Sequence, residues 1–217
     1  MAKKCIYLFD FDNTLYDPAN GLMNELKRRM GLFLAKQLNW TPAEVEERVE
    51  KLRVLHGPII TGFMREYPEH KIDVELFSQF VHDFSLPDYL AVDRRLQALL
   101  AGLPGDVYIL SNGFEEYLDQ ALALLGIKDL VKGIYGIRFV QFSGKPDPNA
   151  YERVIDDIGV DPASVIYFDD NIRDLKPAKK LGMTTVWVSN GQKWQPPKWV
   201  DYRLADIYQL SQLDLSC

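Results

Sequence analysis

The sequence predicts an α/β fold in which a doubly wound parallel sheet is interrupted by an inserted, all-helical cap. Short, continuous apolar runs that end in polar residues recur along the chain, and such runs are typical of strands buried on both faces of a parallel sheet. Segments with helical spacing of apolar residues alternate with these runs. One long helical stretch separates the first run from all the others, which indicates an insertion.

The first predicted strand is the apolar run Cys5–Phe9, which ends in an acid. The segments that follow it carry apolar residues at three- and four-residue steps, as amphipathic helices do. One of them starts at a capping box with proline in the first turn, Thr41–Glu44. Helices are expected over residues 20–39, 41–55, 73–84 and 92–102. No strong strand signal interrupts residues 18–90, so we assign this range to the cap and residues 1–17 and 91–217 to the α/β core.

The second half of the chain alternates strand and helix signals. Buried-strand runs are predicted at Val107–Leu110, Val165–Phe168 and Thr184–Val188, with a weaker strand at Ile134–Val140. Helices are predicted between these runs, over residues 114–125, 147–158 and 172–181. Gly126 and Gly182 are the expected C-terminal stops of the first and last of these helices.

Composition limits the classes of function. The 217 residues include 25 basic and 31 acidic side chains, a net charge of −6, which argues against a partner that is a nucleic acid polymer. No apolar run approaches the roughly 18–20 residues of a membrane helix, and the first run is too short for a signal peptide. Two cysteines, Cys5 and Cys217, do not make a disulfide scaffold. We expect a cytoplasmic monomer or homodimer with no membrane partner.

Polar residues follow the predicted strands, at the edge where open α/β sheets bind ligands. Two separate acid clusters at this edge would repel each other unless a cation lay between them. Carboxylate oxygens favour Mg²⁺, whereas three histidines with no zinc-like spacing argue against zinc. The residues concerned are Asp10, Asp12 and Thr14, then Ser111 and Asn112, then Lys145, and finally Asp169, Asp170 and Asp174.

Such a group has the parts needed for phosphoryl transfer. One carboxylate can be a covalent nucleophile, and a second can exchange a proton. Mg²⁺ and an ammonium can neutralise the phosphoryl group, while a hydroxyl and backbone N–H groups hold its oxygens. The sequence contains neither the G-x-x-x-x-G-K-[ST] loop nor a G-x-G-x-x-G turn after a strand, so nucleotide hydrolysis by a P-loop is not supported.

Four segments, in this order, resemble the four motifs of the haloacid dehalogenase superfamily. They are Phe9–Leu15 (FDFDNTL), Leu110–Asn112 (LSN), Gly144–Asp147 (GKPD) and Tyr167–Asn171 (YFDDN). The resemblance covers the whole chain, and the helical insertion lies where that superfamily places a type-1 cap. It implies a phosphatase rather than a dehalogenase, because the dehalogenases lack an acid at the position of Asp12.

The resemblance also implies roles for individual residues. Asp10 would be the nucleophile that forms an aspartyl-phosphate, and Asp12 would be the general acid and base. Ser111 and Asn112 would lie at the phosphoryl group, together with Lys145, which would also screen the carboxylates. The expected substrate is a small phosphorylated metabolite.

A bound Mg²⁺ is the cofactor that the resemblance implies. Asp10, Asp170 and the backbone carbonyl of Asp12 would hold it. Asp169 stands where glycine is common in the superfamily and is a possible further ligand of the metal or its water. Asp174 would orient the residues around the ion.

The pyrimidine 5′-nucleotidase branch of the superfamily is a closer resemblance. The start FDFDNTLYDPANGLMNEL, the stretch Gly57–Gly62 (GPIITG) and the ending FDDN all look like that branch. This implies a nucleoside 5′-monophosphate as substrate. Gly57 and Gly62 would let the cap backbone approach the leaving group, and Thr61 would supply a hydrogen bond. In the alternative interpretation this stretch is only a turn between two cap helices.

Other functions are open within and beyond this chemistry. Sugar phosphates or phosphoglycolate are alternative substrates for the same site. A receiver-type phospho-switch also combines aspartates, Mg²⁺, a hydroxyl and a lysine, but it would be about 120 residues long, without a helical insertion or an acid two residues past the acceptor. A binding-only relative would be expected to lack an acid or the lysine, and this chain has them all.

Overall fold

The protein is described by a computed structural model that covers residues 5–213. Residues 1–4 and 214–217 lie outside the described range, so the expectations that rest on Cys217 lie outside it too. Within residues 5–213, no helix is long and apolar enough to cross a membrane.

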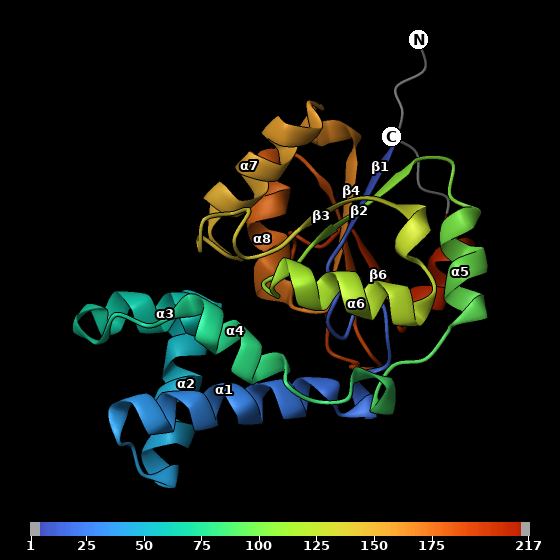
Figure 1. The fold of residues 1–217 in the computed structure, drawn as a ribbon. Helices are drawn as coiled ribbons and strands as arrows, with labels where there is room; N and C mark the ends of the chain where they lie inside the picture. Colours follow the sequence, from blue (N-terminus) through green and yellow to red (C-terminus); the bar gives the residue numbers. More distant parts are fainter. Residues whose placement is uncertain (1–4, 214–217) are drawn as a thin grey trace.

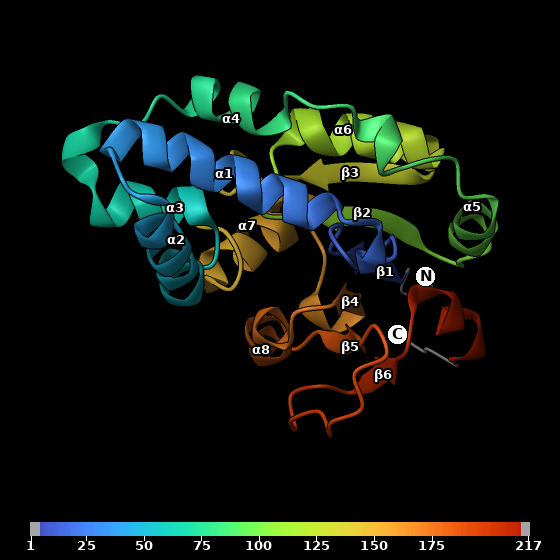
Figure 2. The same cartoon turned by 90° about the horizontal axis from the view of Figure 1, so that it is seen from below.

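Six parallel strands of the described residues form one sheet (Figure 1), and Figure 2 shows their order, β3-β2-β1-β4-β5-β6. The order reverses between β1 and β4, and this is where open α/β sheets bind their ligands. Phe9 of β1 lies opposite Ile109 of β2 on one side and Phe168 of β4 on the other, so the three strands end at the same level. The strands are β1 (Ile6–Phe9), β2 (Asp106–Leu110), β3 (Val131–Tyr135), β4 (Val165–Asp169), β5 (Thr184–Val188) and β6 (Tyr202–Leu204).

Helices cover both faces of the sheet, as predicted for a doubly wound fold. Figure 2 shows α7 (Pro148–Ile158) and α8 (Ile172–Leu181) on one side, and α5 (Arg94–Ala101) and α6 (Glu115–Leu125) on the other. The central strands are therefore buried on both faces, and Leu8, Phe9, Tyr167 and Phe168 are fully buried. Burial of apolar surface contributes about 25 cal/mol per Å², so these buried strands stabilise the fold.

Of the five α-helices between β1 and β2 in the described sequence, the first four form what we call the helical insertion. They are α1 (Leu22–Leu38), α2 (Pro42–His56), α3 (Ile59–Glu66) and α4 (Val74–His82). Figure 1 shows them beside the sheet, near the end at which β1 leaves it. The predicted capping box starts α2, since Thr41 N–H donates to Glu44 at 2.9 Å. Phe33 and Phe77 join α1 to α4. The domain bounds at residues 18 and 90 stay a prediction.

One predicted strand was misplaced. We expected a strand at Ile134–Val140, whereas β3 covers Val131–Tyr135 and residues 136–142 form turns. Gly136 follows the strand at a crowded position, where a side chain would overlap Glu115 and the backbone of Gly113. Ile137 and Val140 are buried from a turn instead of a strand, and the sequence pattern does not distinguish the two.

Gly57 is the point at which the helical insertion touches the loop that carries Lys145. It joins α2 to α3 with φ at +81° and ψ at −95°, a conformation that side chains disfavour. A Cβ on Gly57 would lie 2.2 Å from the carbonyl oxygen of Lys145 and 2.9 Å from Pro146. Only glycine therefore permits this approach.

Replacing Gly57 tests this contact. We expect Gly57→Ala to lower the free energy of unfolding by about 3 kcal/mol or more, because a strained backbone costs roughly 1–3 kcal/mol and the overlap with Lys145 adds to it. Urea denaturation measures the change. Gly159→Ala is the matched control, since Gly159 also has a positive φ, of +72°, but nothing lies within 4 Å of its Cβ position. Equal losses in the two variants would contradict the close approach.

Candidate active site

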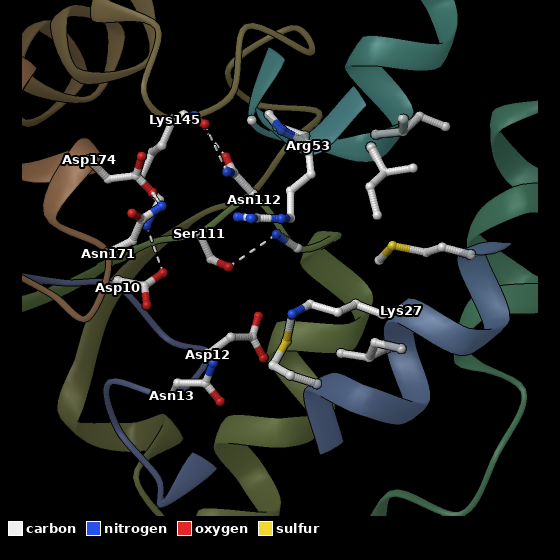
Figure 3. A pocket seen from close by; sticks show the side chains of 18 of the residues that line it. Asp10, Asp12, Asn13, Lys27, Arg53, Ser111, Asn112, Lys145, Asn171 and Asp174 are labelled. Atoms are coloured by element: carbon white, nitrogen blue, oxygen red, sulfur yellow. Dashed lines mark hydrogen bonds and ion pairs between the residues drawn. The ribbon is translucent and has the colours of Figure 1, made fainter. Parts of the chain in front are cut away.

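A cavity of about 370 Å³ lies between the carboxyl ends of the central strands and the helical insertion (Figure 3). Its volume is in the range of small-molecule sites, about 300–1,000 Å³. The sheet side of the wall contains eight of the nine polar residues that the sequence places at this edge of the sheet, all except Thr14. They are Asp10, Asp12, Ser111, Asn112, Lys145, Asp169, Asp170 and Asp174.

Asp10 follows β1 and is almost fully buried. Thr14 donates its hydroxyl to one carboxylate oxygen at 2.8 Å, and the Lys145 ammonium donates to the other at 2.6 Å. Burial raises the pKa of Asp10 to about 7; Lys145 opposes this rise, and the charges of Asp169 and Asp12 add to it. The carboxylate is thus poorly solvated and held in one orientation, as a covalent nucleophile requires.

Lys145 is buried between two carboxylates. Its ammonium donates to Asp10 at 2.6 Å and to Asp169 at 2.8 Å. Burial alone would lower the pKa of Lys145, but the charges of Asp10 and Asp169 raise it well above its ordinary value, so the group stays a cation. The site therefore holds a permanent positive charge close to the proposed nucleophile.

Asn112 lines the cavity and also holds the loop that carries Lys145. Its side chain accepts from Lys145 N–H at 2.8 Å and donates to the Lys145 carbonyl at 3.0 Å, drawn as a dashed line in Figure 3. Each end of the amide makes one hydrogen bond to this loop, and the second N–H of the amide remains for a ligand, so the contact with a phosphoryl group stays a prediction. Ser111 accepts from Gly113 N–H at 3.0 Å, and its hydroxyl proton remains available to a ligand.

Three carboxylates are close enough to share a metal ion. One oxygen each from Asp10, Asp169 and Asp170 lies within 4.8 Å of the others. Burial raises the pKa of Asp170 well above its ordinary value, and the charges of Asp10 and Asp169 raise it further. A cation bound here would relieve this cost, and an all-oxygen donor set suits Mg²⁺. The residues present thus fit the ion that the sequence implies.

The carboxylates of Asp10, Asp169 and Asp170 are not equally available to a metal ion. Both oxygens of Asp169 accept hydrogen bonds, from Lys145 and the Tyr167 hydroxyl on one side and from Asn171 N–H at 2.8 Å on the other. Within residues 5–213, no hydrogen bond reaches the Asp170 carboxylate. Both oxygens of Asp10 also accept hydrogen bonds, from Thr14 and Lys145, so the Asp170 carboxylate is the most available of the three to a metal ion. Asp169 positions Lys145.

Asp174 lies behind this group, on α8. One of its oxygens accepts from Asn171 at 3.1 Å, and the other is buried without a partner among the described residues. Burial raises the pKa of Asp174 to about 8, and the neighbouring charge of Asp169 contributes to the rise. The role predicted for Asp174, orienting the residues around the ion, stays a prediction.

Asp12 is held by two tyrosines that the sequence did not reveal. The hydroxyls of Tyr16 and Tyr117 both donate to its Oδ1 atom, at 2.7 and 2.6 Å. Burial raises the pKa of Asp12, and these hydrogen bonds oppose the rise. In the sequence, Tyr117 was one of several apolar residues on a helix face, and nothing marked its hydroxyl.

The insertion side of the cavity matches the prediction only in part. Gly57 lines it, but Thr61 and Gly62 do not. Residues 59–66 form α3, which turns Thr61 away to donate to the Phe142 carbonyl at 2.8 Å. Gly62 packs against α2 instead, since its Cβ position is 3.0 Å from Leu52. The proposed contacts of Thr61 and Gly62 with a leaving group are therefore corrected.

Other residues of the helical insertion line the cavity instead of Thr61 and Gly62. Lys27 and Arg53 extend into the cavity from α1 and α2, facing Asp12 and Asn112 in Figure 3. Arg53 also pairs with Glu50 at 2.8 Å. His82 of α4 is a further polar residue of this wall, and most of the remainder is apolar, with Met23, Leu26, Met30, Ile59, Ile60 and Phe77. Ile59 and Ile60 belong to the stretch that the sequence offered either as a substrate contact or as a turn between two helices, and they do line the cavity. For the other four, helical periodicity predicted packing within the insertion and could not show that they face a cavity.

Comparison with known proteins finds relatives that cover most of this chain. Phosphate metabolism protein 8 of Saccharomyces cerevisiae is 26% identical over 193 residues, 82% of this chain and 59% of that protein. The chain thus spans less than two thirds of that relative's length. Enolase-phosphatase E1 of a Bradyrhizobium species is 27% identical over 184 residues, 84% of this chain and 69% of that protein.

A solved structure shares the fold. The HAD phosphatase from Thermococcus onnurineus superposes with a TM-score of 0.68 at 22% identity and covers 96% of both chains. A model of the haloacid dehalogenase-like hydrolases matches residues 6–182, a range that contains every carboxylate of the cavity. The chain belongs to the haloacid dehalogenase-like hydrolase family.

Proposed function

We propose that the protein is a Mg²⁺-dependent phosphomonoester hydrolase that acts on a small phosphorylated metabolite through an aspartyl-phosphate. The observation that carries this proposal is the arrangement of Asp10. Its carboxylate is buried, is held by Thr14 and Lys145, and faces a cavity that Asp12 also lines. A desolvated nucleophile beside a fixed cation and a second acid suits attack on a phosphoryl group.

Each of the cavity residues has a distinct role in the proposed reaction. Asp10 attacks phosphorus while Asp12 gives a proton to the leaving oxygen, and Asp12 then takes a proton from the water that hydrolyses the aspartyl-phosphate. Lys145 and Ser111 hold the phosphoryl oxygens. Mg²⁺, bound by Asp10, Asp170 and the carbonyl of Asp12, would supply further positive charge beside the transferring group.

Nucleoside 5′-monophosphates are the substrates we favour within this class. The apolar wall of the helical insertion offers a surface for a flat base, and Lys27 and Arg53 can donate to its carbonyl oxygens. Sugar phosphates and phosphoglycolate are the alternatives. One relative is named an enolase-phosphatase, which is in line with phosphatase chemistry on a small substrate.

The first test of the proposal concerns the nucleophile. We expect Asp10→Asn to fold but to lose turnover of p-nitrophenyl phosphate by several orders of magnitude, because an amide cannot attack phosphorus. Acid quenching during turnover, followed by mass spectrometry, should find a phosphoryl group on Asp10 of the wild type only. Ordinary turnover in Asp10→Asn, with Tm unchanged, would remove the covalent step from the account.

The second test concerns the metal. We expect EDTA to abolish activity and Mg²⁺ to restore it, whereas Ca²⁺ should inhibit, because it prefers more ligands at about 2.3–2.6 Å than Mg²⁺ at about 2.0–2.1 Å. Calorimetric titration should show Mg²⁺ binding that Asp170→Ala weakens at least tenfold. Asp157→Ala is the control, since Asp157 pairs with Tyr135 away from the cavity. Full activity in EDTA would contradict the role of the ion.

The third test concerns selectivity. We expect UMP and CMP to exceed glucose 6-phosphate and phosphoglycolate in kcat/KM. Met30→Ala should reduce kcat/KM for the nucleotides about tenfold, as expected for one lost apolar contact, and should barely affect p-nitrophenyl phosphate. Met64→Ala, on the exposed side of α3, is the matched control. A panel in which nucleotides are no better than the other substrates would leave only a small-molecule phosphatase.

A further inference from the structure

Two phenol hydroxyls converge on a single oxygen of Asp12. Tyr16, in the loop after β1, and Tyr117, on α6, donate to Oδ1 at 2.7 and 2.6 Å. A carboxylate oxygen has two lone pairs in its plane, so two donors fill it. Within the described chain, no hydrogen bond reaches the Oδ2 atom of Asp12. The two oxygens of this carboxylate are therefore inequivalent before any substrate binds.

Both tyrosines are fixed by the packing of their rings. Phe11 makes edge contacts with Tyr16 and with Tyr117, at centroid distances of 5.5 and 5.9 Å. His82 stacks on the other side of Tyr117 at 4.9 Å. Tyr117 is almost completely buried and Tyr16 nearly so. A phenol keeps its proton at neutral pH, since its usual pKa is about 10, so these groups act as donors to Asp12.

We propose that Tyr16 and Tyr117 are positioning residues for proton transfer, which occupy Oδ1 of Asp12 and leave Oδ2 as the atom that exchanges the proton. This inference rests on the proposed phosphatase function and deepens it. An acid that acts on a leaving group must point one defined oxygen at it, within about 2.6–3.2 Å. The two hydroxyls supply that orientation.

The same hydrogen bonds favour the reaction energetically. In the first step the bond between phosphorus and the leaving oxygen breaks, and its electron pair stays on that oxygen, which takes the proton from Oδ2. The electron pair of the O–H bond stays on Asp12, whose charge then spreads over both oxygens. Hydrogen bonds from Tyr16 and Tyr117 to Oδ1 strengthen as this charge develops, because bonds to a carboxylate are about twice as strong as bonds to a neutral group. They therefore stabilise the transition state more than the ground state.

The test compares leaving groups. In Tyr117→Phe, and separately in Tyr16→Phe, we expect kcat/KM for an alkyl phosphate, whose leaving oxygen needs a proton, to fall about 10- to 100-fold, the range for one hydrogen bond to a charged group. With p-nitrophenyl phosphate the loss should stay within about threefold, because that leaving group departs as an anion. Tyr135→Phe is the matched control, since it also removes a buried tyrosine hydroxyl from a carboxylate, that of Asp157, but outside the cavity.

A double-mutant cycle distinguishes positioning from mere stability. Once Asp12→Asn has removed the proton-transfer group, adding Tyr117→Phe should change kcat/KM for the alkyl phosphate less than threefold. Two results would overturn the inference: an equal loss of kcat/KM for both kinds of leaving group, or a 10- to 100-fold further loss of kcat/KM when Tyr117→Phe is added to Asp12→Asn. In either case, activity of the wild type would leave the proposed function intact. If the wild type hydrolyses no phosphomonoester with Mg²⁺ present, the proposed function itself fails.

Discussion

The buried ion pair between Lys145 and the carboxylates at the strand ends is the interaction on which the rest of the structure depends. Asp10 and Asp169 lie side by side because β1 and β4 are adjacent and in register. Two desolvated carboxylates at this spacing repel each other, and Lys145 bonds to both. A buried pair of this kind is weak evidence for stability, since desolvation offsets much of the attraction. A role in the proposed reaction explains a buried lysine at this place better than a contribution to the free energy of unfolding does.

Much of the surrounding structure serves to keep this lysine in place. Asn112 holds the Lys145 backbone through two hydrogen bonds, and Gly57 brings the helical insertion into contact with the same peptide. The Tyr167 hydroxyl shares Asp169 with the ammonium. One loop is thus constrained from β2, from β4 and from the junction of α2 and α3. A substitution at any of these contacts is expected to shift the Lys145 ammonium, even where the substituted residue does not itself line the cavity.

The sequence sufficed for strands β1, β2, β4 and β5 and for the residues at their carboxyl ends, but not for the limits of β3 or for the opposite wall of the cavity. Asp10, Ser111 and Asp169 directly follow buried strands, so a parallel sheet must bring them together. Thr61 was misassigned because its orientation depends on α3, which begins within a stretch expected to be a loop. Tyr117 was missed because helical periodicity reports which face is buried and not which atom the hydroxyl meets. The local sequence pattern therefore predicted which residues lie at the site, whereas tertiary contacts determine how their side chains are oriented.

The two kinds of carboxylate in this site need opposite environments, and the fold supplies both from one short segment. Asp10 and Asp12 are two residues apart, yet Asp10 meets an ammonium and Asp12 meets two phenols. A full positive charge favours the ionised form of Asp10, which the proposed attack needs. Neutral donors orient Asp12 without tying it to a cation, so that in the proposed mechanism it can give up the proton in one step and take one in the other. Residues from α6, from the loop that carries Lys145 and from the loop after β1 must all be in place for this difference to exist. The division of labour between the two aspartates is thus a property of the tertiary structure, although the acids themselves come from one motif.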